Sequence, residues 1–392
     1  MRFSSIDIFC HVIDNYGDAG VVYRFAKEWR VAKPDCRIRV FIDDAAALAE
    51  LVPNFDAMKL LQELGGISYY RFNAIAPELI ERIGTADVLI EAFACHIPEP
   101  VLEAASRRAT VIINLEYFSA EPWIEGYHLK ESLLGRGGLK KYFFMPGITK
   151  QSGGLIIGKN FETSSCTTPG DRYACLNTIL KPYAFYLDPS EDPLVGTIFT
   201  YMRGFDTLLN DLHLIDKKVY LLVFGAKSAE GMRMTLTRLS GRPPTGAWAS
   251  FGKTTVVFMR FVSQDRYDEL LCASDFNIVR GEDSFARAIL SGKPLLWHAY
   301  IQEKKYQLVK VRDFADRLRA YFDDSAIADH YGKTLMAFND MEQEDPLLVT
   351  AERYDRFFLD LNKIGHATRE MSYFIKANCN LIKNLRAFLD QV

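Results

Sequence analysis

The chain has 392 residues, of which 49% are hydrophobic, 25% charged and 13% aromatic, and its net charge is −3. This composition excludes a largely disordered chain, and the length favours two domains. The sequence has no long run of Lys and Arg and no stretch of about 20 uninterrupted apolar residues. We therefore expect no direct nucleic-acid binding and no membrane segment. Asp7 interrupts the apolar start of the chain, which argues against a signal peptide, so we expect a soluble, cytoplasmic protein.

The first half of the chain alternates between strand-like and helix-like segments. Residues 6–13 have the pattern of a buried strand, residues 14–20 are rich in turn formers, and apolar residues at helical spacing follow. A second strand at 37–42 completes a strand–helix–strand unit, which implies a parallel sheet with a right-handed crossover. Further strand-like runs occur at 88–90, 110–115 and 140–145.

The second half repeats this alternation after a segment rich in Pro and Asp, residues 181–193, which we expect to link two domains. Strands are predicted at 196–201, 219–225, 255–259, 276–279 and 294–297. A helix is predicted over 264–274, and the last helix over roughly 371–389. Two successive sheets closed by helices predict two facing α/β domains with a cleft between them.

Two acids, Asp14 and Asp18, lie in the loop that follows the first strand. Ligands usually bind at the carboxyl ends of parallel strands, and a helical turn places acids four residues apart on one side. A carboxylate here could serve as a general base. In the structural alternative, Asp14 forms a turn with its own backbone and Asp18 caps a helix that begins near Gly20.

The run from Arg280 to Ala288 has the pattern of a strand end, a sharp turn and a helix that begins near Ser284. Unpaired N–H groups at a helix start bind anions such as phosphate, and Arg280 adds a second positive contact. Glu282 and Asp283 would repel a phosphate, so these acids would face sugar hydroxyls while backbone amides face the phosphate. The pattern thus suggests a nucleotide sugar. In the structural alternative, no phosphate binds and Asp283 or Ser284 caps the helix.

Phe261 and Gln264 lie between the strand at 255–259 and the helix at 264–274. An aromatic ring and an amide at a strand end could stack on a base and read it. The alternative is core packing for Phe261 and an ordinary first helical position for Gln264.

Seven cysteines and seven histidines are scattered along the chain without the spacing of metal ligands or a Cys-x-x-Cys pair. We therefore expect no disulfide framework and no metal site. Cys10 and Cys95 lie in or beside strands and are expected to be buried thiols, while a single catalytic cysteine stays open as an alternative. His298 follows a strand and is expected to be a structural histidine with satisfied hydrogen bonds, and the alternative is that it reaches the cleft.

Together these motifs resemble one family, the bacterial protein-arginine rhamnosyltransferases of the EarP type, which modify elongation factor P. The resemblance rests on segments 13–20, 91–95, 114–121, 261–264, 279–288, 292–294 and 297–298, in the family's order. It implies a GT-B fold of two facing Rossmann-like domains with a C-terminal helical segment. It also implies transfer of L-rhamnose from dTDP-β-L-rhamnose to an arginine of elongation factor P, with inversion and without a metal or other cofactor. The modification would activate the factor for ribosomes stalled at polyproline.

The resemblance further implies roles for single residues. Asp18 would be the general base, Asp14 would orient the acceptor guanidinium, and Glu282 would be the third catalytic acid. Phe261 and Gln264 would hold the thymine. The other substrate-binding residues that it implies are Asn15, Tyr16, Gly17, Tyr201, Arg280, Gly281, Asp283 and Ser284.

Three segments are expected from this fold. They are an N-terminal acceptor-binding domain at 1–185, a nucleotide-sugar-binding domain at 186–365, and a C-terminal helix at 366–392 that packs back toward the N-terminal domain. Two alternative functions stay open. One is a GT-B glycosyltransferase with another donor or acceptor, and the other is a non-catalytic module that binds the elongation factor.

Overall fold

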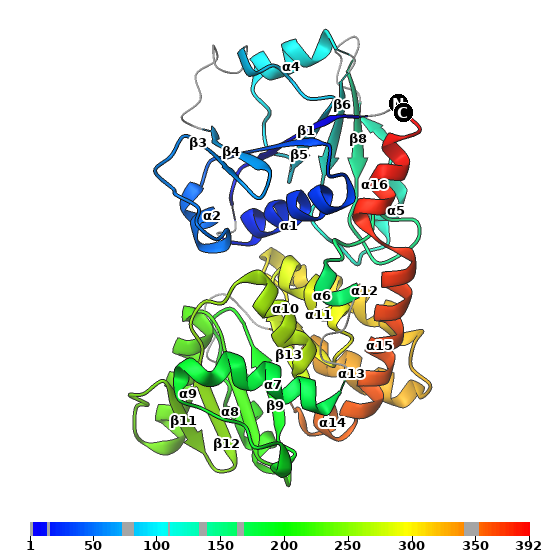
Figure 1. Ribbon diagram of the computed structural model, residues 1–392. Helices are drawn as coiled ribbons and strands as arrows, with labels where there is room; N and C mark the ends of the chain where they lie inside the picture. Colours follow the sequence, from blue (N-terminus) through cyan, green and yellow to red (C-terminus); the bar gives the residue numbers. More distant parts are fainter. Residues whose placement is uncertain are drawn as a thin grey trace. The chain divides into compact units, whose positions relative to one another are not determined.

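The computed structural model describes residues 3–13, 16–72, 82–108, 110–132, 139–162, 168–340 and 353–392. The chain forms two compact units (Figure 1). Unit 1 comprises Met1–Gly158 and Ile375–Val392, and unit 2 comprises Lys159–Phe374. Each unit contains one mostly parallel sheet with helices on both faces, as the alternating pattern of strands and helices predicts.

Unit 1 is built on an eight-stranded sheet with the order β3-β4-β2-β1-β5-β6-β8-β7. Its strands are β1 (Ser5–Cys10), β2 (Arg37–Ile42), β3 (Leu61–Leu64), β4 (Ile67–Arg71), β5 (Val88–Ala92), β6 (Val111–Leu115), β7 (Glu131–Ser132) and β8 (Lys140–Phe144). The inner strands pair in parallel, while the edge strands β3 and β7 run antiparallel to their neighbours. The strand order reverses at β1, which lies between β2 and β5, and ligands bind outside the carboxyl ends of strands at such switch points.

The two faces of this sheet carry separate apolar cores because successive side chains of a strand point to opposite faces. Ile6 and Ile8 of β1 pack in the core that includes residues of α1 and α16, while Phe9 packs on the other face, where its ring stacks on Phe41 at 4.6 Å. The helices of this unit are α1 (Tyr16–Ala32), α2 (Ala45–Leu51), α4 (Glu99–Ser106), α5 (Trp123–Tyr127) and α16 (Leu381–Leu389).

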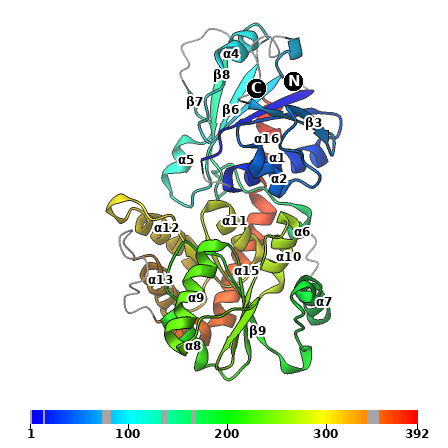
Figure 2. The same ribbon diagram turned by 90° about the vertical axis from the view of Figure 1, so that its left-hand side faces the viewer.

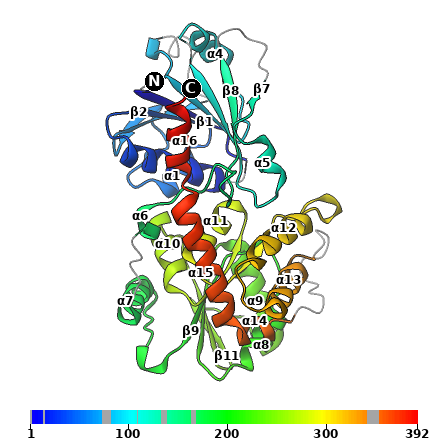
Figure 3. The ribbon, with the colours of Figure 1, turned by 90° about the vertical axis from the view of Figure 1, so that its right-hand side faces the viewer.

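The C-terminal segment returns to unit 1 as a separate helix. The predicted single helix over 371–389 is wrong, because α15 (Leu361–Asn378) ends before α16 begins (Figure 3). Two backbone hydrogen bonds with Leu155 hold the chain at this break. Leu155 donates its N–H to the carbonyl of Cys379 at 2.8 Å and accepts the N–H of Leu381 at 2.9 Å. The Asn380 side chain then caps α16 by accepting the N–H of Lys383 at 3.0 Å.

Unit 2 is built on a six-stranded sheet with the order β11-β12-β10-β9-β13-β14. Its strands are β9 (Leu194–Ile198), β10 (Val219–Val223), β11 (Trp248–Phe251), β12 (Thr254–Phe258), β13 (Phe276–Arg280) and β14 (Leu295–His298). Only β11, at an edge, is antiparallel among these described strands. The connections leave β9 and β13 in opposite directions, so these two neighbours flank the switch point of the second sheet.

The helices of unit 2 cover both faces of its sheet. They are α6 (Lys159–Glu162), α7 (Pro169–Leu180), α8 (Asp206–His213), α9 (Ala226–Ser240), α10 (Gln264–Ala273), α11 (Glu282–Ser291), α12 (Gln307–Arg319), α13 (Ser325–Asn339), α14 (Asp355–Leu359) and most of α15. Figure 2 shows α8 and α9 on one side of the sheet and α7 and α10 on the other. This is the arrangement that right-handed crossovers from β9 and β12 require.

The boundary between the units differs from the predicted 185/186, because residues 159–185 belong to unit 2. Tyr173 and Leu176 of α7 share an apolar core with Val195 of β9 and Leu222 of β10. The segment 181–193, which the sequence predicts to link two domains, therefore lies inside unit 2. The chain also returns to unit 1 at 375 and not at the predicted 366, since most of α15 stays with unit 2.

Candidate functional site

The loop after β1 reaches the switch point of the first sheet. Strand β1 ends at Cys10, before the predicted end at residue 13, and α1 begins at Tyr16. Asp14 and Asn15 lie outside the described residues, so their predicted roles stay predictions. Because α1 begins before the predicted start near Gly20, residues 16–18 form its first turn. The structural alternative for Asp18, a cap of a later helix, is therefore wrong.

The Asp18 carboxylate is held by the backbone that precedes it. Its Oδ2 accepts the N–H of Ile13 at 2.7 Å, and the residue is only 1% exposed. Tyr16 and Gly17 precede it in the same turn of α1. The structure thus places an oriented carboxylate at the carboxyl end of β1, where a ligand of a parallel sheet is expected.

The turn after β13 has the geometry that an anion site needs. Arg280 is the last residue of β13, and α11 begins at Glu282, two residues before the predicted start. The residue before the helix is Gly281, with φ 62° and ψ −176°, a backbone conformation that is almost restricted to glycine. It offers no side chain to cap the helix. Asp283 and Ser284 lie inside the first turn, so neither is the N-terminal cap that the structural alternative proposed.

Two aromatic residues, Trp297 and Phe285, support this turn. The indole Nε1 of Trp297 donates to the carbonyl of Gly281 at 3.0 Å. The ring of Phe285, in the first turns of α11, stacks on the Trp297 ring at 4.0 Å with an interplanar angle of 2°. Because both contacts come from β14 and α11, the turn is supported by regular structure on either side, which favours a preformed site.

The switch point of the second sheet brings Arg280 and Tyr201 together. Tyr201 follows β9 and Arg280 ends β13, and these strands are neighbours. The guanidinium of Arg280 lies 4.8 Å from the centre of the Tyr201 ring and 4.5 Å from that of Phe199. Such cation–π contacts hold the charged group in place. Phe199 is not among the predicted site residues, and in the sequence only its position two residues before Tyr201 indicates a shared location.

Phe261 and Gln264 lie where the sequence predicts them, at the start of α10. Phe261 is 53% exposed, so the alternative of core packing is wrong for this residue. Gln264 is the first residue of α10, and its Oε1 is buried without a hydrogen-bond partner. A buried acceptor of this kind costs free energy until a donor reaches it. The amide is thus suited to a ligand N–H group.

A buried ion pair ties α10 to α11. Arg287 of α11 and Asp268 of α10 form two hydrogen bonds, Nη2 to Oδ2 at 2.8 Å and Nε to Oδ1 at 3.1 Å, and both side chains are only 3% exposed. The pair fixes the helix that begins at Gln264 against the helix that begins at Glu282. Loss of one partner would leave a buried charge, which is strongly destabilising.

His298 differs from its prediction. It is fully buried at the end of β14, and neither ring nitrogen has a hydrogen-bond partner, so it is not a satisfied structural histidine. Its ring packs edge-on against Tyr201 at 5.3 Å. Burial, together with the positive charges of Arg203 and Arg280, holds the pKa of His298 well below its usual range. The imidazole is therefore neutral beside the Arg280 group.

Glu282 has a cationic neighbour that the sequence analysis missed. The Nζ of Lys310, in α12, lies 3.6 Å from the Oε1 of Glu282, and both side chains are about one quarter exposed. Lys310 is 28 residues away in sequence, and no local pattern could connect it with the turn. The contact places a positive charge beside the Glu282 carboxylate.

The buried thiols do not have the properties of nucleophiles. Cys10 and Cys95 are buried, as predicted. Burial, with the nearby Glu91 carboxylate adding to it, raises the pKa of the Cys95 thiol to about 12, and burial also raises that of Cys10. Since the thiolate is the reactive form, neither group supports the alternative of a catalytic cysteine.

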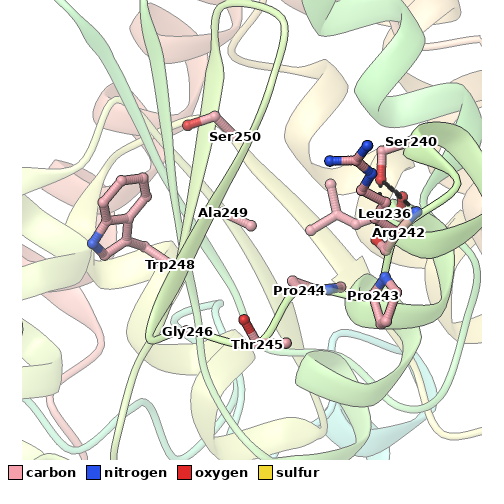
Figure 4. A pocket seen from close by; sticks show the side chains of 10 residues that line it. All are labelled: Leu236, Ser240, Arg242, Pro243, Pro244, Thr245, Gly246, Trp248, Ala249 and Ser250. Atoms are coloured by element: carbon pink, nitrogen blue, oxygen red, sulfur yellow. Dashed lines mark hydrogen bonds between the residues drawn. The ribbon is translucent and has the colours of Figure 1, made fainter.

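Other features of the described residues lie apart from this site. A hollow of about 480 Å³ lies beside the edge strand β11. Figure 4 shows the side chains that line it. Its lining residues are Leu236, Ser240, Arg242, Pro243, Pro244, Thr245, Gly246, Trp248, Ala249 and Ser250, none of which is a predicted site residue. Within the described ranges, no group of three or more His, Cys, Asp or Glu side chains is placed to hold a metal ion. In the same ranges, no helix combines the length and apolarity of a membrane span.

Comparison with known proteins identifies the family. The model of the family described as Elongation-Factor P (EF-P) rhamnosyltransferase EarP matches residues 6–390. The chain belongs to this family. A protein-arginine rhamnosyltransferase of Pseudomonas putida is 35% identical over 327 residues, which are 82% of this chain and 83% of the relative. One from Shewanella oneidensis is 33% identical over 356 residues, 86% of each chain. The resemblance that the motifs suggested is confirmed.

Solved structures place this EarP family member in a known fold class. The structure described as the structural basis for EarP-mediated arginine glycosylation of translation elongation factor EF-P covers 99% of both chains, with 22% identity and a TM-score of 0.60. A glycosyltransferase from Rickettsia africae covers 100% of this chain and 98% of its own, with 11% identity and a TM-score of 0.50. The predicted α/β fold of the GT-B glycosyltransferase class is confirmed.

Proposed function

We propose that this EarP family member transfers L-rhamnose from dTDP-β-L-rhamnose to an arginine side chain of elongation factor P, with inversion at the sugar carbon. The match to the family over residues 6–390 carries the proposal. The two loops at the switch points support it, since they contain an oriented acid in unit 1 and, in unit 2, a helix start without a side-chain cap that follows Arg280.

The loop after β1 would receive the acceptor. Inversion needs a single displacement and no covalent sugar intermediate, so one carboxylate on the acceptor side suffices as base. Asp18 is the residue for this role, with Asp14 as the neighbour that orients the guanidinium. Because a guanidinium has a pKa above about 12, the carboxylates would polarise and orient it, and the proton would leave late, as the new C–N bond forms. Asn15, Tyr16 and Gly17 would line the same loop.

The turn after β13 would receive the donor. Arg280 and the backbone N–H groups at the start of α11 would stabilise the negative charge that develops on the departing diphosphate. Asp283 and Ser284 lie in the same first helical turn. Glu282, the proposed third acid, would face the sugar, with Lys310 beside it as a cationic neighbour.

The start of α10 would receive the base of the nucleotide. The buried Oε1 of Gln264 would accept the N3–H of thymine, which supplies the missing hydrogen bond. The exposed ring of Phe261 would stack on the base. Tyr201, which packs against Arg280, would border the diphosphate.

We propose that the reaction needs no metal and no further cofactor, because Arg280 and the helix start supply the positive charge at the leaving group. The partners are then elongation factor P and dTDP-β-L-rhamnose, with no direct part for nucleic acid or membrane. An enzyme that modifies a translation factor works in the cytoplasm.

Intact-mass spectrometry of elongation factor P, incubated with this protein and dTDP-β-L-rhamnose, tests the proposal. The expected result is a gain of one deoxyhexose, mapped to a single arginine. A mass gain that appears only with another nucleotide sugar would show that the protein uses that donor instead. Tight binding to elongation factor P without any mass gain would favour the non-catalytic module and overturn the proposal.

A further inference from the structure

Asp43 lies immediately after β2, beside the end of β1. The two strands pair in parallel through Cys10 and Ile42. Asp43 therefore follows the last paired residue of its strand and faces the segment in which β1 leaves the sheet. Its side chain is 19% exposed.

Asp43 holds this segment through two groups. Its Oδ1 accepts the N–H of Val12 at 2.9 Å, and its Oδ2 lies 2.6 Å from the Nδ1 of His11. The next backbone N–H along the chain, that of Ile13, is taken by Asp18. Two successive N–H groups that have left the strand ladder are thus satisfied by two carboxylates, as such groups require. We call this arrangement, Asp43–Val12 and Asp18–Ile13, the loop clamp.

The charge of Asp43 strengthens its side of the clamp. Burial alone would raise the pKa of this carboxyl, but hydrogen bonds from the Val12 N–H, from His11 and from the Asp44 N–H hold it below its usual range. The group is therefore ionised at neutral pH, and hydrogen bonds to an ionised acceptor are stronger than those between neutral groups.

We propose that Asp43 is a positioning residue for the reaction. By fixing Val12 and His11, it sets the place of Ile13, whose N–H in turn orients the Asp18 carboxylate. This inference rests on the proposed function, because it assigns Asp18 the role of base. Asp43 itself contacts the chain before the loop and takes no part in the bond that forms.

The neighbouring acid offers a matched control. Asp44 caps α2 by accepting the N–H of Ala47 at 3.0 Å, and its side chain takes no part in the loop clamp. Asp43→Ala and Asp44→Ala remove the same charge at adjacent positions, and each loses a hydrogen bond to a backbone N–H. Only Asp43→Ala opens the clamp. In Asp43→Asn the side-chain carbonyl oxygen still accepts the Val12 N–H.

The test combines single-turnover transfer at saturating donor and acceptor, dTDP binding, and amide hydrogen exchange over residues 11–18. A small misplacement of a catalytic group costs about 10²-fold. We therefore expect Asp43→Ala to slow transfer by about 10- to 100-fold, with dTDP affinity unchanged and with faster exchange at Val12 and Ile13. Asp43→Asn is expected to recover much of the rate, and Asp44→Ala to match the wild type within about threefold.

Two results would overturn the inference. One is equal turnover in Asp43→Ala and Asp44→Ala. The other is unchanged protection of Val12 and Ile13 in Asp43→Ala. If the wild type does not modify elongation factor P at all, the proposed function fails. In that case, hydrogen exchange at Val12 and Ile13 in Asp43→Ala and in the wild type still tests whether Asp43 holds this segment.

Discussion

Arg280→Lys tests whether the donor site depends on a preformed guanidinium or only on positive charge. Two aromatic rings, those of Phe199 and Tyr201, hold the Arg280 group at 4.5 and 4.8 Å before any ligand arrives. A lysine would have to be ordered on binding, at about 0.5–1.5 kcal/mol. It would also lose one of the two hydrogen bonds that a guanidinium makes to a phosphate, worth about 1.5 kcal/mol. Together these losses are about 2–3 kcal/mol, or about 30- to 150-fold weaker binding.

Isothermal titration with dTDP measures this loss. Arg266→Lys is the matched control, because Arg266 lies near the start of α10 but is paired with Glu269 at 2.6 Å. It should bind dTDP as the wild type does. If Arg280→Lys binds within threefold of the wild type, charge alone suffices and the role assigned to the aromatic support is wrong. If Arg266→Lys loses as much affinity, the effect is not specific to the turn after β13.

Three further predictions follow from the site and its support. Asp18→Asn should lower turnover by about 10²–10⁴-fold in intact-mass time courses while dTDP affinity stays within a few-fold, and near-normal turnover would remove Asp18 as the base. Gly281→Ala, at φ 62°, should lower the free energy of unfolding in urea by about 1–3 kcal/mol and weaken dTDP binding. Gly292→Ala, at φ 66° after the other end of α11, should lower stability without changing dTDP affinity. Equal losses of dTDP affinity in the two variants would contradict this prediction. Burial lowers the pKa of His128 to about 4, and its Nδ1 accepts the Met145 N–H, so only the unfolded chain binds this proton between about pH 6.5 and 4. The free energy of unfolding should therefore fall by up to about 3 kcal/mol as the pH falls through that range. His128→Gln can still accept the Met145 N–H but cannot bind the proton, so this variant should show a smaller fall. If urea unfolding of His128→Gln has the same pH dependence as that of the wild type, His128 is not the group responsible.

Local pattern predicted most of the elements because each depends on nearby residues. The alternation of apolar residues located the parallel strands of both sheets, and β2 was predicted with the bounds that it has, 37–42. The turn at Gly281 was also readable, since an Arg-Gly-Glu-Asp sequence between an apolar strand and an apolar helix leaves few other conformations. The predicted starts of α1 and α11 differ from the observed ones by four and two residues. These differences are enough to move Asp18 and Asp283 from a possible cap position into the first helical turn.

What the sequence by itself determined was therefore the order of strands and helices, the sharp turn after β13 and the family to which the chain belongs. Only the tertiary structure decided which loops share a switch point, because that depends on strand order and not on neighbours in the chain. It placed Arg280 on the rings of Phe199 and Tyr201, left Gln264 with a buried acceptor, and closed the loop clamp through Asp43. The contacts of Arg280 and of Asp43 join residues that are distant in sequence, and their geometry is set by packing of the sheet, which no local pattern records.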